Sequence, residues 1–345
     1  MSHKTRTYLG VSGQDASEVS DSHEILRLAV LIPCYNEAQT IGQVVREFRQ
    51  TLPDAKVYVY DNNSFDNTAI IAAEAGALVR REPLQGKGFV VSRMFSEIDA
   101  DIYLLCDGDS TYDVASAPEM IQCLLRDQLD MVCASRVDTS VDAYRPGHRF
   151  GNLILTGLVA AIFGRQFRDM LTGYRVFSRR FVKSFPVLSS GFEIETQMTV
   201  HALEMQMRVA EVATPYFERP PGSFSKLSTY KDGWRILRTI IILVKEERPL
   251  VFFSVMFLFL ISFSLILGFP IIGEYVRTGL VPRFPTAILA TGLALLAFLS
   301  LASGLILDTV SHGRREAKRL FYLALAPLPF IDRDCEGYGA ENDGC

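Results

Sequence analysis

Residues 28–37 read LAVLIPCYNE, and this stretch decides the fold class of the chain. Its first five residues are apolar and are followed at once by Pro33, a pattern typical of a short buried strand. The polar turn PCYNE then leads into residues 41–48, where the apolar side chains have helical spacing. The stretch therefore predicts a strand, a turn that carries polar side chains, and a helix.

The same succession repeats further along the chain. Apolar or β-branched runs alternate with helical patterns from residue 56 to residue 134. The expected strands are 56–60, 77–80, 102–106 and 131–134, and the expected helices are 68–77 and 89–98. This alternation predicts an α/β fold, in which a mostly parallel sheet has helices on both faces.

Polar side chains follow the ends of several of these strands. They are Asn36 and Glu37, Asp61, Asn62 and Asn63, Asp107 and Asp109, and Arg136. Sheets of this kind bind their ligands beyond the carboxyl ends of the strands. The sequence therefore predicts a functional site at that edge of the sheet.

Composition and short motifs exclude several classes of function. The net charge of −4 and the lack of a basic-aromatic cluster argue against nucleic acid as a partner. Neither GxGxxG nor GxxxxGK[ST] occurs, so we expect neither a dinucleotide oxidoreductase nor a P-loop phosphotransferase. The cysteines form no CxxC pair, which favours reduced thiols in a cytoplasmic chain. These are Cys34, Cys106, Cys123, Cys133, Cys335 and Cys345.

Two runs near the C-terminus, 250–273 and 284–307, contain no charged residue and no histidine. Each is long enough as a helix to cross roughly 30 Å of hydrocarbon. We therefore expect two transmembrane helices, joined by residues 274–283. Basic residues flank the pair, whereas the link carries only Arg277 and Arg283. The flanking residues are Lys231, Arg235, Arg238, Lys245, Arg248, Arg314, Arg315, Lys318 and Arg319.

This bias of positive charge sets the expected orientation. Loops rich in lysine and arginine stay on the cytoplasmic side of a membrane. We therefore expect a protein integral to the cytoplasmic membrane, with the large N-terminal domain and both termini in the cytoplasm.

Three short motifs carry the expected chemistry. The carboxylates of Asp107 and Asp109 could hold a hard divalent cation, Mg²⁺ or Mn²⁺, which would neutralise a departing diphosphate. Asp61 stands where it could accept a hydrogen bond from a nucleobase, and Gly86-Lys87-Gly88 offers a cation to phosphate. Each motif also has a structural interpretation. Asp107 and Asp109 could belong to an ordinary acidic turn, and Gly86-Lys87-Gly88 could be an ordinary glycine turn. The segment after Asp61 could be the start of a helix that Ser64 or Asp66 caps.

The joint occurrence of these motifs resembles the family 2 glycosyltransferases, which are inverting enzymes of the GT-A fold. The resemblance rests on PxYNE, DNNSxDNT, GKG and DGD in this order, and covers about residues 29–227. Ser135-Arg136, the segment DMLTGYR at 169–175, and Arg219 with GSFSK at 222–226 extend it. Together with the two apolar runs, the chain resembles the dolichol-phosphate mannosyltransferase and GtrB-like subgroup.

The resemblance implies transfer of a sugar, with inversion, from a UDP- or GDP-sugar donor to a polyprenyl phosphate in the membrane. It implies a catalytic role for Asp109, Asp169 and Arg136, and metal binding by Asp107 and Asp109. The implied nucleotide-sugar site consists of Pro33, Tyr35, Glu37, Asp61, Asn63, Lys87 and Asp107. The implied phosphate-binding residues, for donor or lipid, are Arg136, Arg149, Arg219, Ser225 and Lys226.

Several alternatives stay open at this point. Asp169 could instead hold the turn at Thr172-Gly173, and Arg149 could be an ordinary surface charge. Asn62, Asn63 and Thr111 depart from the family's usual residues, which leaves the donor base and sugar undecided. The acceptor could be a glycan, a glycolipid or a protein. A non-catalytic scaffold that binds nucleotide-sugars is the alternative from another class.

The expected organisation has five parts. Residues 1–25 form a tail, and residues 26–228 form the glycosyltransferase domain. Residues 229–248 form an amphipathic helix at the membrane surface, and 249–309 contain the two transmembrane helices. Residues 310–345 form a basic cytoplasmic segment at the interface. Contacts between transmembrane helices of different copies could form a homo-oligomer.

Overall fold

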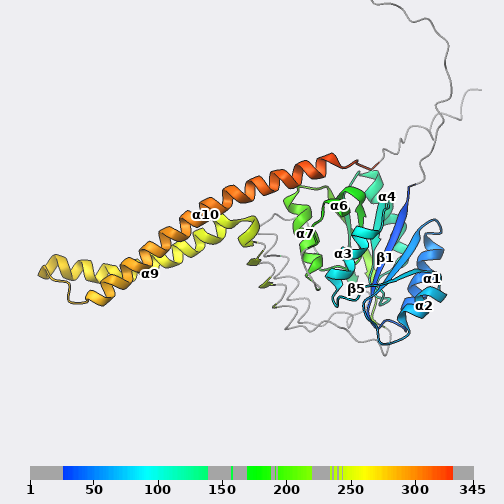
Figure 1. Ribbon diagram of the computed structural model, residues 1–345, viewed down its shortest axis with the longest axis horizontal. Coiled ribbons are helices and arrows are strands. Elements are labelled where there is room, and N and C mark those ends of the chain that lie inside the picture. The colour runs from blue at the N-terminus through cyan, green and yellow to red at the C-terminus, as the bar shows by residue number, and fades with distance from the viewer. Residues whose placement is uncertain are drawn as a thin grey trace, which may run out of the picture.

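The computed structural model of the protein describes residues 26–138, 157, 169–187, 191, 193–219, 234, 237–238, 241–242 and 244–328. These residues form an α/β domain and a hairpin of two long helices, α9 and α10, that projects away from it (Figure 1).

A seven-stranded sheet in the order β3-β2-β1-β4-β6-β5-β7 organises the domain. Every pairing is parallel except those of β6, which runs antiparallel to both of its neighbours. The carboxyl ends of six strands therefore meet at one edge of the sheet, together with the start of β6. The strands are β1 Leu28–Cys34, β2 Lys56–Asp61, β3 Leu78–Arg81, β4 Ile102–Leu105, β5 Met131–Asp138, β6 Arg175–Ser178 and β7 Val209–Tyr216.

Helices cover both faces of this sheet, because successive residues of the central strands point to opposite sides. Val30 of β1 belongs to the core beneath one set of helices, and Leu31 belongs to the core beneath the other. The first set is α1 Ile41–Thr51, α2 Thr68–Glu74, the 3-10 turn η1 Val114–Ser116 and α4 Ala117–Arg126. The second set is α3 Lys87–Glu97, α6 Arg179–Ser184 and α7 Ile194–Glu204.

The expectation of a mostly parallel sheet with helices on both faces is confirmed. The expected strands lie within or beside β1 to β5, and the expected helices correspond to α1, α2 and α3. Strands β6 and β7 were not expected, and β6 begins with a charged residue, Arg175. That guanidinium is fully buried and donates to the backbone oxygens of Thr172 and Met170 and to the hydroxyl of Thr199.

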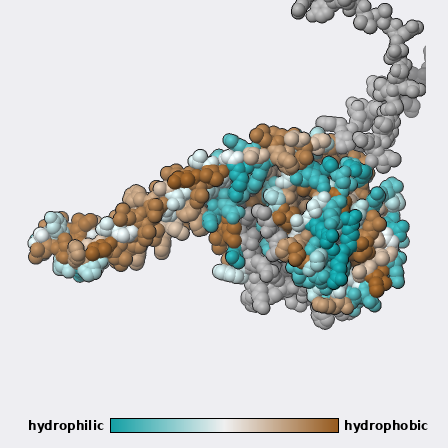
Figure 2. All heavy atoms as spheres, viewed as in Figure 1, coloured by the Kyte–Doolittle hydropathy of each residue, from teal (hydrophilic) through white to brown (hydrophobic). Residues whose placement is uncertain are grey.

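The hairpin consists of α9, Pro249–Thr278, and α10, Phe284–Ala324. Both helices are long and apolar enough to cross a membrane. Most of their side chains are exposed, and hydrophobic residues cover the hairpin in Figure 2. The two helices contact each other through small residues, as helices in membranes commonly do. The hydroxyl of Ser264 donates to the backbone oxygen of Ala290 at 2.7 Å, and Gly304 lies against Phe253.

Helix α10 is longer than the apolar run from which it was expected. It continues without a break to Ala324, and its last turns pack on the α/β domain. The Tyr322 hydroxyl donates to the buried carboxylate of Asp130 at 2.7 Å, and the Lys318 ammonium lies 3.1 Å from the Glu204 carboxylate. The basic segment expected from residue 310 onward therefore begins as a helix that holds the domain to the hairpin.

Two other expected parts fall on undescribed residues. The tail at 1–25 lies wholly outside the described part of the chain, and half of the amphipathic helix expected at 229–248 lies outside it. Both stay predictions.

Candidate active site

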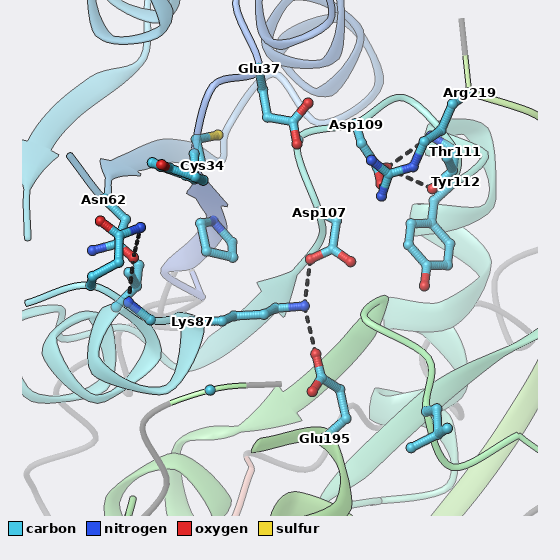
Figure 3. Close-up of a pocket in the computed structure, with 18 of the residues that line it drawn as sticks. Cys34, Glu37, Asn62, Lys87, Asp107, Asp109, Thr111, Tyr112, Glu195 and Arg219 are labelled. Atoms are coloured by element: carbon cyan, nitrogen blue, oxygen red, sulfur yellow. Dashed lines mark hydrogen bonds and ion pairs between the residues drawn. The ribbon is translucent and has the colours of Figure 1, made fainter. Parts of the chain in front are cut away.

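A cavity of about 510 Å³ lies at the carboxyl edge of the sheet. Residues that follow β1, β2 and β4 line it, together with residues of β5, α7 and β7 (Figure 3). The polar or charged lining residues are Tyr35, Glu37, Asn62, Gln85, Lys87, Asp107, Asp109, Thr111, Tyr112, Arg136, Glu195, Tyr216 and Arg219.

The PCYNE turn is fixed by the segment that follows β2. The backbone N–H of Asn36 donates to the Ser64 hydroxyl, and that of Glu37 donates to the Thr68 hydroxyl, both at 2.8 Å. Asn36 itself has a φ of 51°, a conformation that asparagine tolerates better than most residues. These contacts bring two motifs that lie about 28 residues apart to one side of the cavity.

Asn62 holds the loop that precedes Lys87. Its side-chain amide donates to the backbone oxygens of Glu82 and Leu84, and its oxygen accepts from the N–H of Gly86 at 2.7 Å. Gly86 has a φ of 141°, which an L-residue rarely adopts, so glycine is required at this position. Asn62 therefore sets the start of α3, whose first residue is Lys87.

Lys87 lies between two carboxylates at the centre of the cavity. Its ammonium is 2.6 Å from Asp107 Oδ1 and 2.6 Å from Glu195 Oε1. Burial alone would lower the pKa of this ammonium, but the attraction of Asp107 and Glu195 raises it above the ordinary value. Lys87 therefore stays charged inside the protein, and part of the Asp107 side chain stays open to the cavity.

Asp109 is nearly inaccessible and accepts from two directions. Arg219 lies 2.5 Å from Oδ2, and the Thr111 hydroxyl donates to Oδ1 at 2.6 Å. Burial and the neighbouring charge of Asp107 raise the pKa of Asp109. Gly173 leaves the space for Asp107, because a Cβ at Gly173 would lie 2.3 Å from an Asp107 oxygen.

Arg136 and Asp169 form a bidentate ion pair at the rim of the cavity. The two N···O distances are 2.6 and 2.8 Å, and the guanidinium lies over the ring of Tyr216. The N–H of Asp169 donates to Glu211 at 3.0 Å, which ties the segment before β6 to β7. Arg136 lines the cavity, whereas Asp169 stands behind it as the partner of Arg136.

The structure brings together most of the residues expected from the sequence. Pro33, Tyr35, Glu37, Lys87, Asp107, Asp109, Arg136 and Arg219 line the cavity. Asp61 and Asn63 lie next to it but do not line it. The Asn63 side chain donates to the backbone oxygen of Pro83. Arg149, Ser225 and Lys226 lie outside the described residues.

Asp61 has one oxygen available for a ligand. Its side chain is buried, and Oδ2 accepts weakly from the N–H of Ser64 at 3.3 Å. Oδ1 has no hydrogen-bond partner among the described residues. A buried carboxylate oxygen without a donor is costly, so this position suits a ligand that supplies an N–H.

Sequence reasoning missed Glu195, which lines the cavity from α7 and is as buried as Asp109. No motif in the sequence marks it. It is a carboxylate within the otherwise buried stretch that follows Ile194, and such a charge needs a partner. Lys87 is that partner, but only the fold brings the two together.

The two predicted metal ligands fit a divalent cation in their chemistry. Among the described residues, no group of three or more His, Cys, Asp or Glu side chains could hold a metal ion. Asp107 and Asp109 alone would leave coordination positions for ligand oxygens. Burial first and the charge of Asp107 second raise the pKa of Asp109, and a bound cation would offset both effects.

Comparisons with known proteins agree with this architecture. The crystal structure of glucosyl-3-phosphoglycerate synthase from Mycobacterium tuberculosis, in complex with Mn²⁺, UDP and phosphoglyceric acid, superposes with a TM-score of 0.52. The sequences are 20% identical, and the match covers 64% of this chain and 78% of that one. At this identity the likeness establishes the fold.

Among the relatives are several proteins from Haloferax volcanii. The glycosyltransferase AglJ is 35% identical over 229 residues, which cover 66% of this chain and 75% of AglJ. A dolichyl-phosphate hexose transferase is 27% identical over 221 residues, which cover 64% of this chain and 95% of the relative. The family model "Glycosyl transferase family 2" matches residues 29–185. This chain is therefore a member of glycosyl transferase family 2.

Proposed function

We propose that this glycosyltransferase moves a sugar from a UDP- or GDP-sugar to a polyprenyl phosphate at the cytoplasmic face of a membrane, with inversion at the anomeric carbon. One observation carries the proposal. The α/β domain contains a cavity lined by carboxylates and cationic side chains. The same domain is attached to a hairpin of membrane-spanning length, because α10 runs without a break from the hairpin to the domain. The name of the dolichyl-phosphate hexose transferase supports the choice of acceptor.

The donor would lie along the carboxyl ends of β1, β2 and β4. The nucleoside would lie against Pro33, Tyr35 and Glu37, which line the cavity. Asp61 and Asn63 stand next to the cavity, and Oδ1 of Asp61, which has no hydrogen-bond partner among the described residues, would accept from a nucleobase N–H. Lys87 and Asp107 would meet the diphosphate end. In the proposed complex, Asp107 and Asp109 hold Mg²⁺ or Mn²⁺, which supplies positive charge to the leaving diphosphate.

The acceptor phosphate would approach Arg136 and Arg219 at the rim. A phosphomonoester has a second pKa of about 6, so it is already largely ionised near neutral pH. It therefore needs little help from a general base. The paired geometry supports Asp169 as a positioning residue that aims Arg136. Arg149, Ser225 and Lys226, which lie outside the described residues, are proposed from the sequence alone as further phosphate ligands.

The membrane placement follows from the hairpin and its flanking charges. We propose that α9 and the apolar part of α10 span the bilayer, with the catalytic domain and both termini in the cytoplasm. The segment at 229–248 would lie on the headgroups, and the hairpin could also form contacts in a homo-oligomer. The lipid acceptor would then meet the cavity without leaving the bilayer.

The test is transfer by the full-length purified protein with added polyprenyl phosphate and a panel of labelled nucleotide-sugars. We expect a product that extracts into organic solvent and releases its sugar in mild acid. Asp109→Asn should lower the turnover by at least about 100-fold, because it weakens the proposed site for the cation that would neutralise the leaving diphosphate. Asp127→Asn, which changes an exposed carboxylate that pairs with Arg126, is the matched control.

Two outcomes would contradict the proposal. A product that stays in the aqueous phase or resists mild acid would point to a glycan or glycolipid acceptor. Donor binding without release of a nucleoside diphosphate would indicate a binding protein instead.

A further inference from the structure

Glu195 lines the catalytic cavity from the first turn of α7, and the proposed function gives it no role. Its side chain is only 5% exposed, and its Oε1 lies 2.6 Å from the ammonium of Lys87. Placing a carboxylate and an ammonium in a buried position is costly, even when they pair. The fold maintains this pair at the centre of a ligand cavity, where its charges act on whatever binds there.

The ammonium of Lys87 is shared between two carboxylates, which lie on opposite sides of it in Figure 3. Asp107 and Glu195 each place one oxygen 2.6 Å from the nitrogen. The Asp107 side chain is 28% exposed, whereas those of Lys87 and Glu195 are almost fully buried. Of the three groups, Asp107 is therefore the one most open to a ligand in the cavity.

The ion pairs at the centre of the cavity leave an excess of one negative charge. Three carboxylates, those of Asp107, Asp109 and Glu195, face two cations, Lys87 and Arg219. Without the charge of Glu195 this cluster would be neutral, and Lys87 would act on Asp107 alone. An ammonium at this distance competes with a metal ion for the same carboxylate, because the two cations repel each other in a site of low polarity.

The local structure favours the ionised form of Glu195. Burial raises the pKa of this carboxyl group, and the contact with Lys87 opposes that shift. The first turn of α7 adds the positive end of a helix dipole, which also favours a carboxylate. A contact of 2.6 Å with an ammonium is typical of a charged pair. Glu195 can therefore offset the charge of Lys87.

We propose that Glu195 is a positioning residue for the metal site: it offsets the charge of Lys87, so that Asp107 keeps enough negative charge to bind a divalent cation. Lys87 then stays in the cavity as a fixed cation for the donor's phosphates without weakening the metal site. The inference rests on the metal site of the proposed function and extends it to a residue that acts through Lys87.

The experiment measures the affinity for Mn²⁺ rather than sugar transfer. Full-length purified protein in detergent is titrated with Mn²⁺, with and without UDP or GDP, and free Mn²⁺ is followed by electron paramagnetic resonance. Glu195→Gln should weaken Mn²⁺ binding about tenfold, because the charge of Lys87 is then no longer offset beside Asp107. Thermal unfolding checks that each variant is folded.

Two further variants test whether the effect passes through Lys87. Lys87→Met together with Glu195→Gln removes both charges, so the Mn²⁺ affinity should return to within about threefold of the wild-type value. Glu195→Asp keeps the charge but moves it away from the ammonium, and should weaken Mn²⁺ binding about threefold.

Glu204→Gln is the matched control, because Glu204 is a buried carboxylate at the other end of α7 that also pairs with a lysine. This variant should leave the Mn²⁺ affinity unchanged.

Unchanged Mn²⁺ affinity in Glu195→Gln and Glu195→Asp would overturn the inference, and Glu195 would then serve the fold alone. A loss of affinity that persists in the double variant would also overturn it, because the effect would not pass through Lys87. Both results would leave the proposed function intact. A wild-type protein that binds no Mn²⁺, even with UDP or GDP, would contradict the metal site of the proposed function as well.

Discussion

The two ends of α7 present the same kind of ion pair in different settings. At the N-terminal end, Glu195 pairs with Lys87 at 2.6 Å inside the catalytic cavity. At the C-terminal end, about 13 Å away along the helix, Glu204 pairs with Lys318 of α10 at 3.1 Å, where the domain meets the hairpin. Lys87 belongs to the α/β domain and is almost fully buried, whereas Lys318 comes from the hairpin and is partly exposed.

The difference suggests what each pair does. A buried lysine held between two carboxylates stays charged and fixed, which suits binding of a donor's phosphates. A partly exposed lysine that bridges two separately folded parts of the chain acts mainly in attaching them. Changes at the two ends of α7 should therefore affect different properties of the protein.

The largest effect is expected at the N-terminal end. Lys87→Met leaves Glu195 buried without its cation, and should lower the free energy of unfolding by about 3–5 kcal/mol. Transfer activity should also be lost, because the cation facing the donor is removed. Thermal or denaturant unfolding and the transfer assay measure the two quantities.

A double variant separates stability from catalysis in this experiment. Lys87→Met with Glu195→Gln removes both buried charges, so much of the stability should return while the activity stays lost. Recovery of activity in the double variant would show that Lys87 serves the fold alone, and the comparison between the two ends of α7 would then fail.

An intermediate effect is expected where α10 meets the domain. Tyr322→Phe removes the hydroxyl that donates to Asp130 but keeps the ring between Arg180 and Arg319. Hydrogen bonds to charged groups contribute about 1.5–3 kcal/mol. Hydrogen exchange of the last turns of α10 should therefore accelerate, while exchange in α7 near Glu195 stays unchanged. Equal acceleration at both places would mean that the domain and the hairpin unfold as one unit.

The smallest expected effect is the pH dependence of protein stability that Glu204, at the C-terminal end of α7, contributes. Burial and the neighbouring Glu247 raise the pKa of Glu204 to about 7. A carboxyl group whose pKa is higher in the folded than in the unfolded protein stabilises the fold when it is protonated. This contribution is fully present below the unfolded pKa of 4.5 and is lost as the pH rises through 7. Glu204→Gln should remove this dependence, which we expect to be about 1 kcal/mol after screening by solvent.

Thermal unfolding of the wild-type protein and of the Glu204→Gln variant, at pH 5 and at pH 8, measures that difference. The wild-type protein should lose more stability between the two values than the variant. The same loss in both proteins would assign the pH dependence to other groups.

Much of the fold and part of the site could be predicted from the sequence, for a local reason. Polar residues of the site follow the ends of β1, β2 and β4, so Glu37, Asn62 and Asp107 could be placed at one edge without knowledge of distant contacts. The pairing of Arg136 with Asp169, and of Lys87 with Glu195, could not, because each joins segments that only the folded chain brings together. Glu195 lacked a motif, and its burial was visible only in the structure.

The full length of α10 could not be predicted from the hydrophobic pattern either. The hydrophobic run ends at Leu307 because Asp308 follows it, and a membrane criterion stops there. The residues beyond are nonetheless good helix formers, and no proline occurs after Pro285 until Pro327. The helix therefore continues past the apolar run until it reaches the domain.

That continuity has a mechanical consequence. At 41 residues, α10 is about 62 Å long and continues from the proposed bilayer core to its contacts with the domain at Glu204 and Asp130. Membrane helices tilt when the hydrocarbon thickness changes. A thinner or thicker bilayer would therefore swing the catalytic cleft toward or away from the lipid surface, so that membrane thickness itself would adjust how easily the acceptor enters.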